Sequence, residues 1–133
     1  MYSLGIDVGS VSTNLVLLDN NNNVVEKLYV RTRGKPMEAV QLVLSEIRKK
    51  YDSKQIYSAG TTGSGRMIAS IQIGADIVKN EITAHAVAAI QTEKDVRTVL
   101  EIGGQDSKII IIRDGVVTDF AMNTVCAAGT GSF

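Results

Sequence analysis

The N-terminal part of the chain alternates between apolar and polar positions in a way that indicates three strands. Residues 2–10 have the pattern of a strand that ends in a glycine-containing turn, and residues 13–19 that of a second, mostly apolar strand. The asparagine run 20–23 supplies turn-forming side chains, after which residues 24–32 return as a third strand. Because the connections are tight, we predict an antiparallel three-stranded meander.

After Pro36 the spacing of apolar residues becomes helical, which predicts an amphipathic helix from Pro36 to Tyr51. Residues 55–66 indicate a short buried strand that runs into a glycine-rich turn, and residues 80–94 an alanine-rich helix. Residues 97–123 have the pattern strand, glycine turn, strand, Asp-Gly turn, strand. This order of elements predicts an α/β fold in which helices cover a mixed sheet.

Composition narrows the class of protein. The 133 residues fit one domain of ordinary size. Fourteen basic residues balance 14 acidic ones, so charge does not favour a nucleic-acid partner or an anionic membrane surface. The apolar runs are strand-sized and the N-terminus lacks a signal pattern, so we expect a cytoplasmic protein without a membrane partner.

Two strand-turn-strand segments carry candidate chemistry: "GIDVGSVSTN" at 5–14 and "EIGGQDSK" at 101–108. Glycines allow backbone N–H groups to approach an anion closely, and successive turn amides form an anion-binding concavity. Asp7 and Asp106 are placed to hold Mg²⁺ through water, since hard cations prefer oxygen ligands. Either segment alone is equally well explained as an ordinary hairpin, but their joint occurrence favours a site for phosphate and metal.

Four motifs, "GIDVGSVST", "GGQDSK", "NEITAHA" and "NTVCAAGTGSF", resemble the N-terminal half of the activator ATPases of 2-hydroxyacyl-CoA dehydratases and benzoyl-CoA reductases. This BadF/BadG/BcrA/BcrD family is part of the superfamily of acetate and sugar kinases, heat-shock chaperones and actin. The resemblance runs from about Gly5 to Phe133. It implies a ribonuclease-H-like lobe over 1–133, with the second lobe of an actin-like ATPase absent.

The resemblance also implies the activity and its cofactors. Such proteins bind ATP and Mg²⁺, and two identical subunits share one 4Fe-4S cluster. ATP turnover then drives a low-potential electron into a CoA-ester dehydratase or reductase. We therefore expect a homodimer and an acyl-CoA enzyme as partner.

Individual site residues follow from the same resemblance. The catalytic candidates are Asp7, Glu101 and Asp106. The expected nucleotide-binding residues are Gly9, Ser10, Ser12 and Thr13 in the first loop and Gly103, Gly104 and Gln105 in the second. Glu101 either positions metal or water or is a polar residue on an exposed strand face. Lys108 lies just beyond the second loop, where a structural role would account for it.

Cys126 matches the first cluster ligand of the family. The glycines after it suit a turn that leads into a helix, whose N-terminal amides would stabilise a thiolate. A cluster is normally held by four thiolates, and the chain has a single cysteine. We therefore expect the sequence to be a truncated half of a longer protein. The alternative for Cys126 is a small buried apolar side chain.

Weaker candidates remain. Arg66 either faces a nucleotide or subunit partner or begins a helix, and Glu81 and His85 share a helix face at a spacing that can bind metal. We interpret His85 mainly as a packing or interface residue. Two other functions stay open: a kinase or chaperone-like nucleotide-binding domain in which Cys126 is incidental, and a sensor module without activity.

Overall fold

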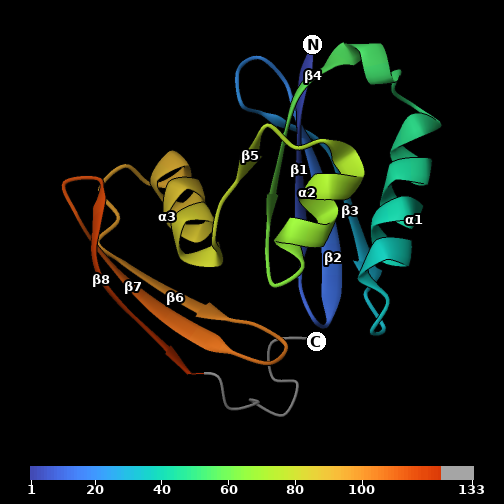
Figure 1. The fold of residues 1–133 in the computed structure, drawn as a ribbon. Helices are drawn as coiled ribbons and strands as arrows, with labels where there is room; N and C mark the ends of the chain where they lie inside the picture. Colours follow the sequence, from blue (N-terminus) through green and yellow to red (C-terminus); the bar gives the residue numbers. More distant parts are fainter. Residues whose placement is uncertain (124–133) are drawn as a thin grey trace. The chain divides into compact units, whose positions relative to one another are not determined.

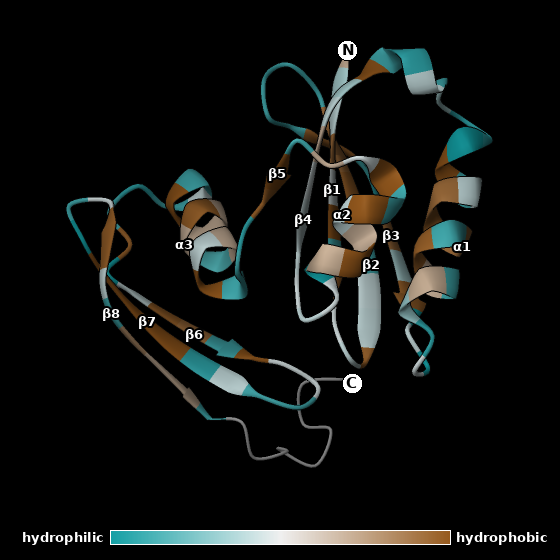
Figure 2. Ribbon diagram, viewed as in Figure 1, coloured by the Kyte–Doolittle hydropathy of each residue, from teal (hydrophilic) through white to brown (hydrophobic). Residues whose placement is uncertain are grey.

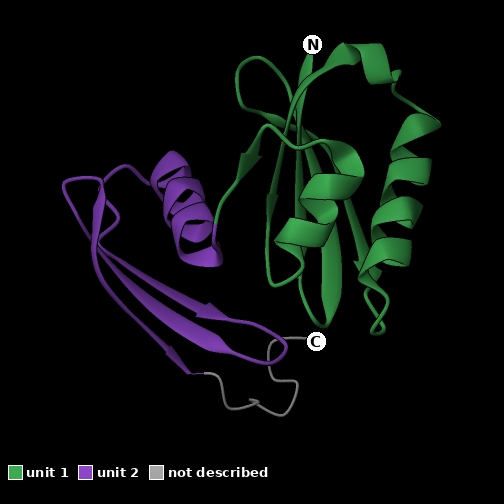
Figure 3. Ribbon diagram, viewed as in Figure 1, with its two compact units in different colours: residues 1–79 green, residues 80–133 purple. Residues whose placement is uncertain are grey.

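The structure is a computed structural model and describes residues 1–123, so the predicted Cys126 loop lies outside the described residues. The chain divides into two compact units, residues 1–79 and the part that begins at Asn80 (Figure 3). Each unit has its own sheet and its own apolar core. The assignment of residues 1–133 to a single ribonuclease-H-like lobe stays a prediction.

The first unit is built on a five-stranded mixed sheet in the order β3-β2-β1-β4-β5 (Figure 1). The three N-terminal strands pair antiparallel, as the alternation of their residues predicts, and β4 joins β1 in parallel. The α/β fold class with a mixed sheet and an antiparallel meander is therefore confirmed. The strands are β1 Tyr2–Val8, β2 Ser12–Leu18, β3 Val24–Arg31, β4 Ile56–Thr62 and β5 Ile77–Val78.

Two α-helices belong to this unit. Helix α1, Pro36–Arg48, begins with the proline at its N-terminus as predicted and ends before Tyr51, and a single 3₁₀ turn, Ser53–Gln55, precedes β4. Helix α2, Arg66–Ile73, begins at Arg66, so the helix-entry interpretation of the glycine-rich turn is confirmed. Within residues 1–123, no helix is both long and apolar enough to cross a membrane.

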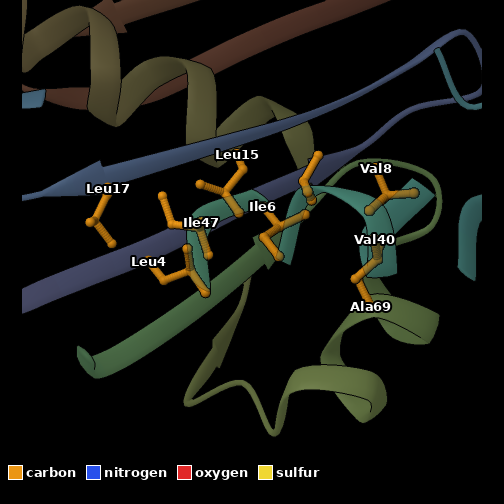
Figure 4. Packing of buried hydrophobic residues seen from close by; sticks show 9 residues of the cluster. Leu4, Ile6, Val8, Leu15, Leu17, Val40, Ile47 and Ala69 are labelled. Atoms are coloured by element: carbon orange, nitrogen blue, oxygen red, sulfur yellow. The ribbon is translucent and has the colours of Figure 1, made fainter. Parts of the chain in front are cut away.

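The core of the first unit lies between the sheet and these two helices (Figure 4). Alternate residues of β1 and β2 point into it, and Val40 and Ile47 of α1 and Ala69 of α2 cover them. The strand residues in this core are Leu4, Ile6, Val8, Leu15 and Leu17. Because side chains alternate along a strand, Asp7 and Asn14 lie on the opposite face of the sheet, away from α1 and α2.

The second unit packs helix α3, Glu81–Thr92, on a three-stranded antiparallel sheet in the order β6-β7-β8 (Figure 1). Its apolar core contains Ile82 and Ala86 of α3 and Ile110 and Ile112 of β7. The strands are β6 Thr98–Ile102, β7 Ser107–Arg113 and β8 Val116–Asn123. Figure 2 shows the apolar stretches of these strands in brown. The predicted strand-turn-strand order is confirmed.

Candidate functional site

A row of polar residues crosses three neighbouring strands of the first unit at the end of β1. Asp7 is paired in register with Asn14 of β2 on one side and with Thr62 of β4 on the other. Register partners project from the same face of a sheet, so the three side chains lie on the face that α1 and α2 leave uncovered. We call Asn14, Asp7 and Thr62 the polar row.

Thr62 contributes a buried hydroxyl that has no hydrogen-bond partner among the described residues. A buried hydroxyl without a partner is costly, and one beside a carboxylate marks a position where a ligand oxygen or a water would complete the bonding. The neighbouring Thr61 differs, because it points into the core side and donates its hydroxyl to the Arg66 carbonyl at 3.0 Å. Of these two neighbouring threonines, only Thr62 on the Asp7 face therefore has an unsatisfied hydroxyl.

The loop after β4 packs tightly against the end of β1. Gly63 has φ +92°, and a Cβ there would lie 2.4 Å from the Val8 carbonyl oxygen and 2.5 Å from Asp7 Oδ1. The backbone amide of Gly65 donates to the same Val8 oxygen at 2.8 Å. Arg66 then begins α2 and donates its guanidinium to the Gly63 carbonyl at 3.0 Å. Only glycine allows the loop to pass this close to the Asp7 carboxylate.

The first predicted phosphate loop is the turn between β1 and β2. Gly9 donates its amide to the Ser12 carbonyl at 2.9 Å, and Thr32, after β3, donates its hydroxyl to the Gly9 carbonyl at 2.8 Å. Thr13 is fully buried and its hydroxyl lies 3.0 Å from that of Thr32, whereas Ser10 is exposed at the tip of the turn. Thr13 thus stabilises the turn from the core side.

The second predicted phosphate loop joins β6 to β7. Gly103 donates its amide to the Asp106 carbonyl at 2.8 Å, and a Cβ at Gly103 would lie 3.2 Å from Asp106 Oδ1. Gly104 and the exposed Gln105 form the tip of this turn. The turn therefore brings backbone amides and the Asp106 carboxylate together within a few residues.

Lys108 lies at the base of this second turn, with its side chain only 1% exposed. Its Nζ is 2.9 Å from Asp106 Oδ1, 3.0 Å from Glu101 Oε2 and 3.1 Å from Glu81 Oε2. We call these three acidic residues the carboxylate cluster. Burial alone would lower the pKa of Lys108, but its hydrogen bonds to Asp106, Glu101 and Glu81 outweigh burial and hold the pKa above its usual value. Lys108 is therefore a charged side chain.

These contacts revise the picture of several sequence candidates. Glu101 is not on a fully exposed strand face, because its carboxylate is paired with Lys108. Glu81 contacts the same ammonium group, and His85 lies partly buried on α3. Among residues 1–123, no group of three or more His, Cys, Asp or Glu side chains is arranged to hold a metal ion. A magnesium role for Asp7 and Asp106 through water stays a prediction.

Two members of the polar row were missed by the sequence analysis. Asn14 follows from the hairpin itself, since a turn that pairs Val8 with Thr13 also pairs Asp7 with Asn14. Thr62 comes from a strand more than 40 residues away, and its parallel register with β1 has no signal in the sequence. The shared site for phosphate and metal that the two loops suggest stays a prediction, because the two turns belong to different units.

A mixed sheet that begins with an antiparallel meander agrees with the actin-like ATPase fold of the chain's structural neighbours. Within that class, the chain belongs to the BadF/BadG/BcrA/BcrD ATPase family, whose model matches residues 4–133. The resemblance found in the motifs is confirmed.

The chain is 38% identical over 137 residues to the (R)-2-hydroxyglutaryl-CoA dehydratase activating ATPase of Acidaminococcus fermentans, covering 100% of this chain and 51% of that protein. It is 38% identical over 139 residues to the activator of lactoyl-CoA dehydratase of Anaerotignum propionicum, again covering 100% of this chain and 51% of the relative. The activator of the 2-hydroxyisocaproyl-CoA dehydratase from Clostridium difficile, solved with bound ADPNP, superposes with a TM-score of 0.80 at 30% identity, covering 98% of this chain and 48% of that one. The chain thus spans about half the length of the curated relatives it matches.

Proposed function

We propose that this chain is the phosphate-binding part of an ATP-hydrolysing activator of a CoA-ester dehydratase or reductase. The observation that carries the proposal is the polar row, in which an unsatisfied buried hydroxyl, Thr62 Oγ1, lies beside the Asp7 carboxylate at a glycine turn. Membership of an ATPase family and similarity to a protein solved with bound ADPNP support the same assignment.

The residues of the two turns fit Mg²⁺ and phosphate by their chemistry. Asp7 and Asp106 offer carboxylate oxygens, and Asn14 and Thr62 offer neutral polar atoms. The glycines of each turn leave its backbone open to close approach by an anion. Hard divalent cations take oxygen ligands and retain water, which suits single carboxylates on separate turns. When bound, Mg²⁺ would supply electrostatic stabilisation of negative charge on the phosphoryl oxygens.

In this proposal each residue of the chain has a separate task. The amides of Gly9 and Gly103 close their own turns, so other backbone amides at the tips of the two turns would donate to phosphate oxygens. Asp7 and Asp106 would hold Mg²⁺ through water. Glu101, fixed by Lys108, orients the water that attacks the terminal phosphate. Catalysis of phosphoryl transfer rests largely on such positioning and on electrostatic stabilisation.

The electron-transfer part of the proposal rests on Cys126 and on the family. Since a cluster needs four thiolates and this sequence supplies one, the chain by itself does not fit a 4Fe-4S cluster. Thiolates from elsewhere in a longer subunit and from a second copy would have to complete it. We therefore propose a homodimer that shares the cluster and passes an electron to the dehydratase or reductase in the cytoplasm.

Substitution of the two aspartates tests the ATPase assignment. In the intact protein, Asp7→Ala and Asp106→Ala should each reduce Mg-ATP hydrolysis by about 100-fold or more, because each removes a metal-organising charge. Circular dichroism and thermal unfolding should show a retained fold, since Asp7 is only half-buried and Asp106 lies on a turn. Unchanged turnover in both variants would remove the ATPase assignment.

The cluster is tested by colour and absorbance. Intact protein purified without oxygen should be brown and bind close to one cluster per dimer. Cys126→Ala should lose the visible absorption while it retains nucleotide binding, because the thiolate and the phosphate turns are separate groups. A Cys126→Ala protein that keeps its colour and iron content would exclude Cys126 as a ligand.

A further inference from the structure

One buried ammonium group, that of Lys108, binds the carboxylates in and beside the second glycine turn. An ammonium group has three N–H donors, and Lys108 Nζ has three carboxylates within 3.1 Å, from Asp106, Glu101 and Glu81. These carboxylates come from three places: Glu101 from the strand before the turn, Asp106 from the turn and Glu81 from helix α3. A single side chain therefore joins both sides of the turn to the neighbouring helix.

The charge balance makes this contact important for the shape of the turn. Three carboxylates around one ammonium leave an excess of two negative charges, and the acidic side chains are each between 23% and 32% exposed. Without Lys108 the carboxylates would repel one another in a partly buried environment, where the effective dielectric constant is low and like charges interact strongly. The Asp106 side chain would then rotate toward water, and the carboxylate would lose its fixed direction in a turn that the backbone bond from the Gly103 amide to the Asp106 carbonyl closes.

Stability alone is a poor explanation for such an arrangement. A buried ion pair is often no more stabilising than an apolar replacement of the same size, because desolvation offsets the Coulomb attraction. What the ion pairs do supply is orientation, since hydrogen-bonded charges fix the direction of a carboxylate. Asp106 Oδ1 faces Lys108, so Oδ2 is the oxygen left for a metal-bound water.

We propose that Lys108 is a positioning residue that holds the turn at 103–106, with Asp106 and Glu101, in its Mg-nucleotide-binding conformation and anchors it to helix α3 through Glu81. This inference rests on the proposed function, because it assigns the turn a nucleotide to bind. It also gives Glu81 a task that the sequence pattern, with its Glu81–His85 spacing, does not predict. The coupling to α3 is direct, since Glu81 is the first residue of that helix.

Lys108→Met tests the proposal, because methionine keeps the length and the apolar stem of lysine and removes its charge. The intact ATPase without nucleotide is compared with this variant by hydrogen–deuterium exchange of peptides that cover residues 98–108. We expect exchange at the turn to rise by at least tenfold, and the dissociation constant for Mg-ADP to rise by about 10- to 100-fold, as for other residues that orient a metal ligand. Peptides from the first unit should keep their exchange rates.

Two further variants keep the test decisive. Glu81→Gln leaves Lys108 with Asp106 and Glu101 but weakens the anchor to α3, so it should cause an intermediate rise in both measurements and remains informative if Lys108→Met does not fold. Lys50→Met is the matched control, because Lys50 pairs with Glu26 at 2.7 Å in the first unit with its side chain 65% exposed. It should leave the turn and the affinity for Mg-ADP unchanged.

The outcomes separate the inference from the proposed function. Unchanged exchange at the turn in Lys108→Met and Glu81→Gln overturns the positioning role, whatever the affinity. Faster exchange with an unchanged dissociation constant also overturns it if Asp106→Ala weakens Mg-ADP binding, and the proposed function then survives. If Asp7→Ala and Asp106→Ala leave Mg-ADP binding unchanged, the proposed function fails and this inference fails with it.

Discussion

At the scale of single residues, two neighbouring threonines of β4 have different roles, since one stabilises the fold and the other is a candidate for ligand binding. Thr61 donates its hydroxyl to a backbone carbonyl, whereas the buried hydroxyl of Thr62 has no partner among the described residues. A buried polar atom without a partner costs roughly 1–3 kcal/mol, and a satisfied hydrogen bond contributes about 1 kcal/mol. Replacement by valine, which has nearly the same shape, should therefore have opposite effects at the two positions.

We expect Thr62→Val to raise the free energy of unfolding by about 1 kcal/mol in the absence of nucleotide and to weaken Mg-ATP binding. Thr61→Val should lower the free energy of unfolding by about the same amount. Urea denaturation and calorimetric titration measure the two quantities. A Thr62→Val protein that is destabilised would show that its hydroxyl is already satisfied in the free protein.

The backbone around Gly63 leaves no space for a side chain. Its φ of +92° and the 2.4 Å that would separate an added Cβ from the Val8 oxygen both exclude alanine without movement of the backbone. Gly63→Ala should cost about 3 kcal/mol or more and displace the loop from Asp7. Gly74→Ala is the control, since Gly74 has φ +64° but open space around it and should cost only about 1 kcal/mol. Equal losses in denaturation midpoints would contradict the steric argument.

At the scale of elements, one ion pair links helix α1 to the meander. Lys50, just after α1, donates to Glu26 of β3 at 2.7 Å. The hydrogen bond and charge of Lys50 lower the pKa of Glu26, and those of Glu26 raise the pKa of Lys50. A carboxyl whose pKa is lowered by folding stabilises the fold at pH values above its pKa in the unfolded chain, and this stabilisation is lost on acidification. A lysine whose pKa is raised by folding stabilises the fold at pH values below its pKa in the unfolded chain, and this stabilisation is lost in alkali.

The pair should therefore stabilise the fold fully between the ordinary pKa values, 4.5 for Glu26 and 10.5 for Lys50, and progressively less outside them. The melting temperature of Glu26→Gln should be slightly below that of the parent at neutral pH, and the difference should shrink as the pH falls below 4.5 and in concentrated salt. Thermal unfolding from about pH 3 to about pH 9 measures this. A difference that persists under the acidic condition would show that the glutamate acts by packing.

The elements that follow from local pattern were predictable, and those that depend on distant packing were not. The meander and α1 follow from apolar alternation and from Pro36. Helix α2 has only eight residues, several of them β-branched, and it is stabilised by burying Ala69 against the sheet. Strand β5 has two residues and exists because it pairs with β4. No local pattern specifies either element.

The residues of the candidate site likewise fall into those that the sequence predicts and those that depend on tertiary packing. Asp7 and Asp106 stand out in the sequence because each lies beside glycines in a strand-turn-strand segment. The partner of Lys108 on α3 could not be inferred, because Glu81 and Lys108 are 27 positions apart and meet only through the packing of α3 on β7. Charge pairing across elements is set by the tertiary fold and leaves no periodic signal.

At the scale of the whole molecule, both units repeat one local design. In each, an apolar strand carries a carboxylate, turns through glycine and returns as an antiparallel partner. The support differs, because Thr32 holds the first turn through neutral hydroxyl bonds and Lys108 holds the second through charges. The second turn should therefore be the more sensitive of the two to salt and to charge substitution.

The last prediction concerns what these 133 residues can do alone. The relatives are about twice as long, and this sequence supplies one cysteine, so a chain of these residues lacks the thiolates of a cluster and whatever contacts the rest of the protein adds to a nucleotide. Much of a ligand's favourable burial would be missing, while the ordering cost of binding remains. We expect the isolated chain to fold, to be colourless and to bind and hydrolyse ATP only weakly. Calorimetry that shows binding at about micromolar affinity or better would show that these residues already form most of the nucleotide site.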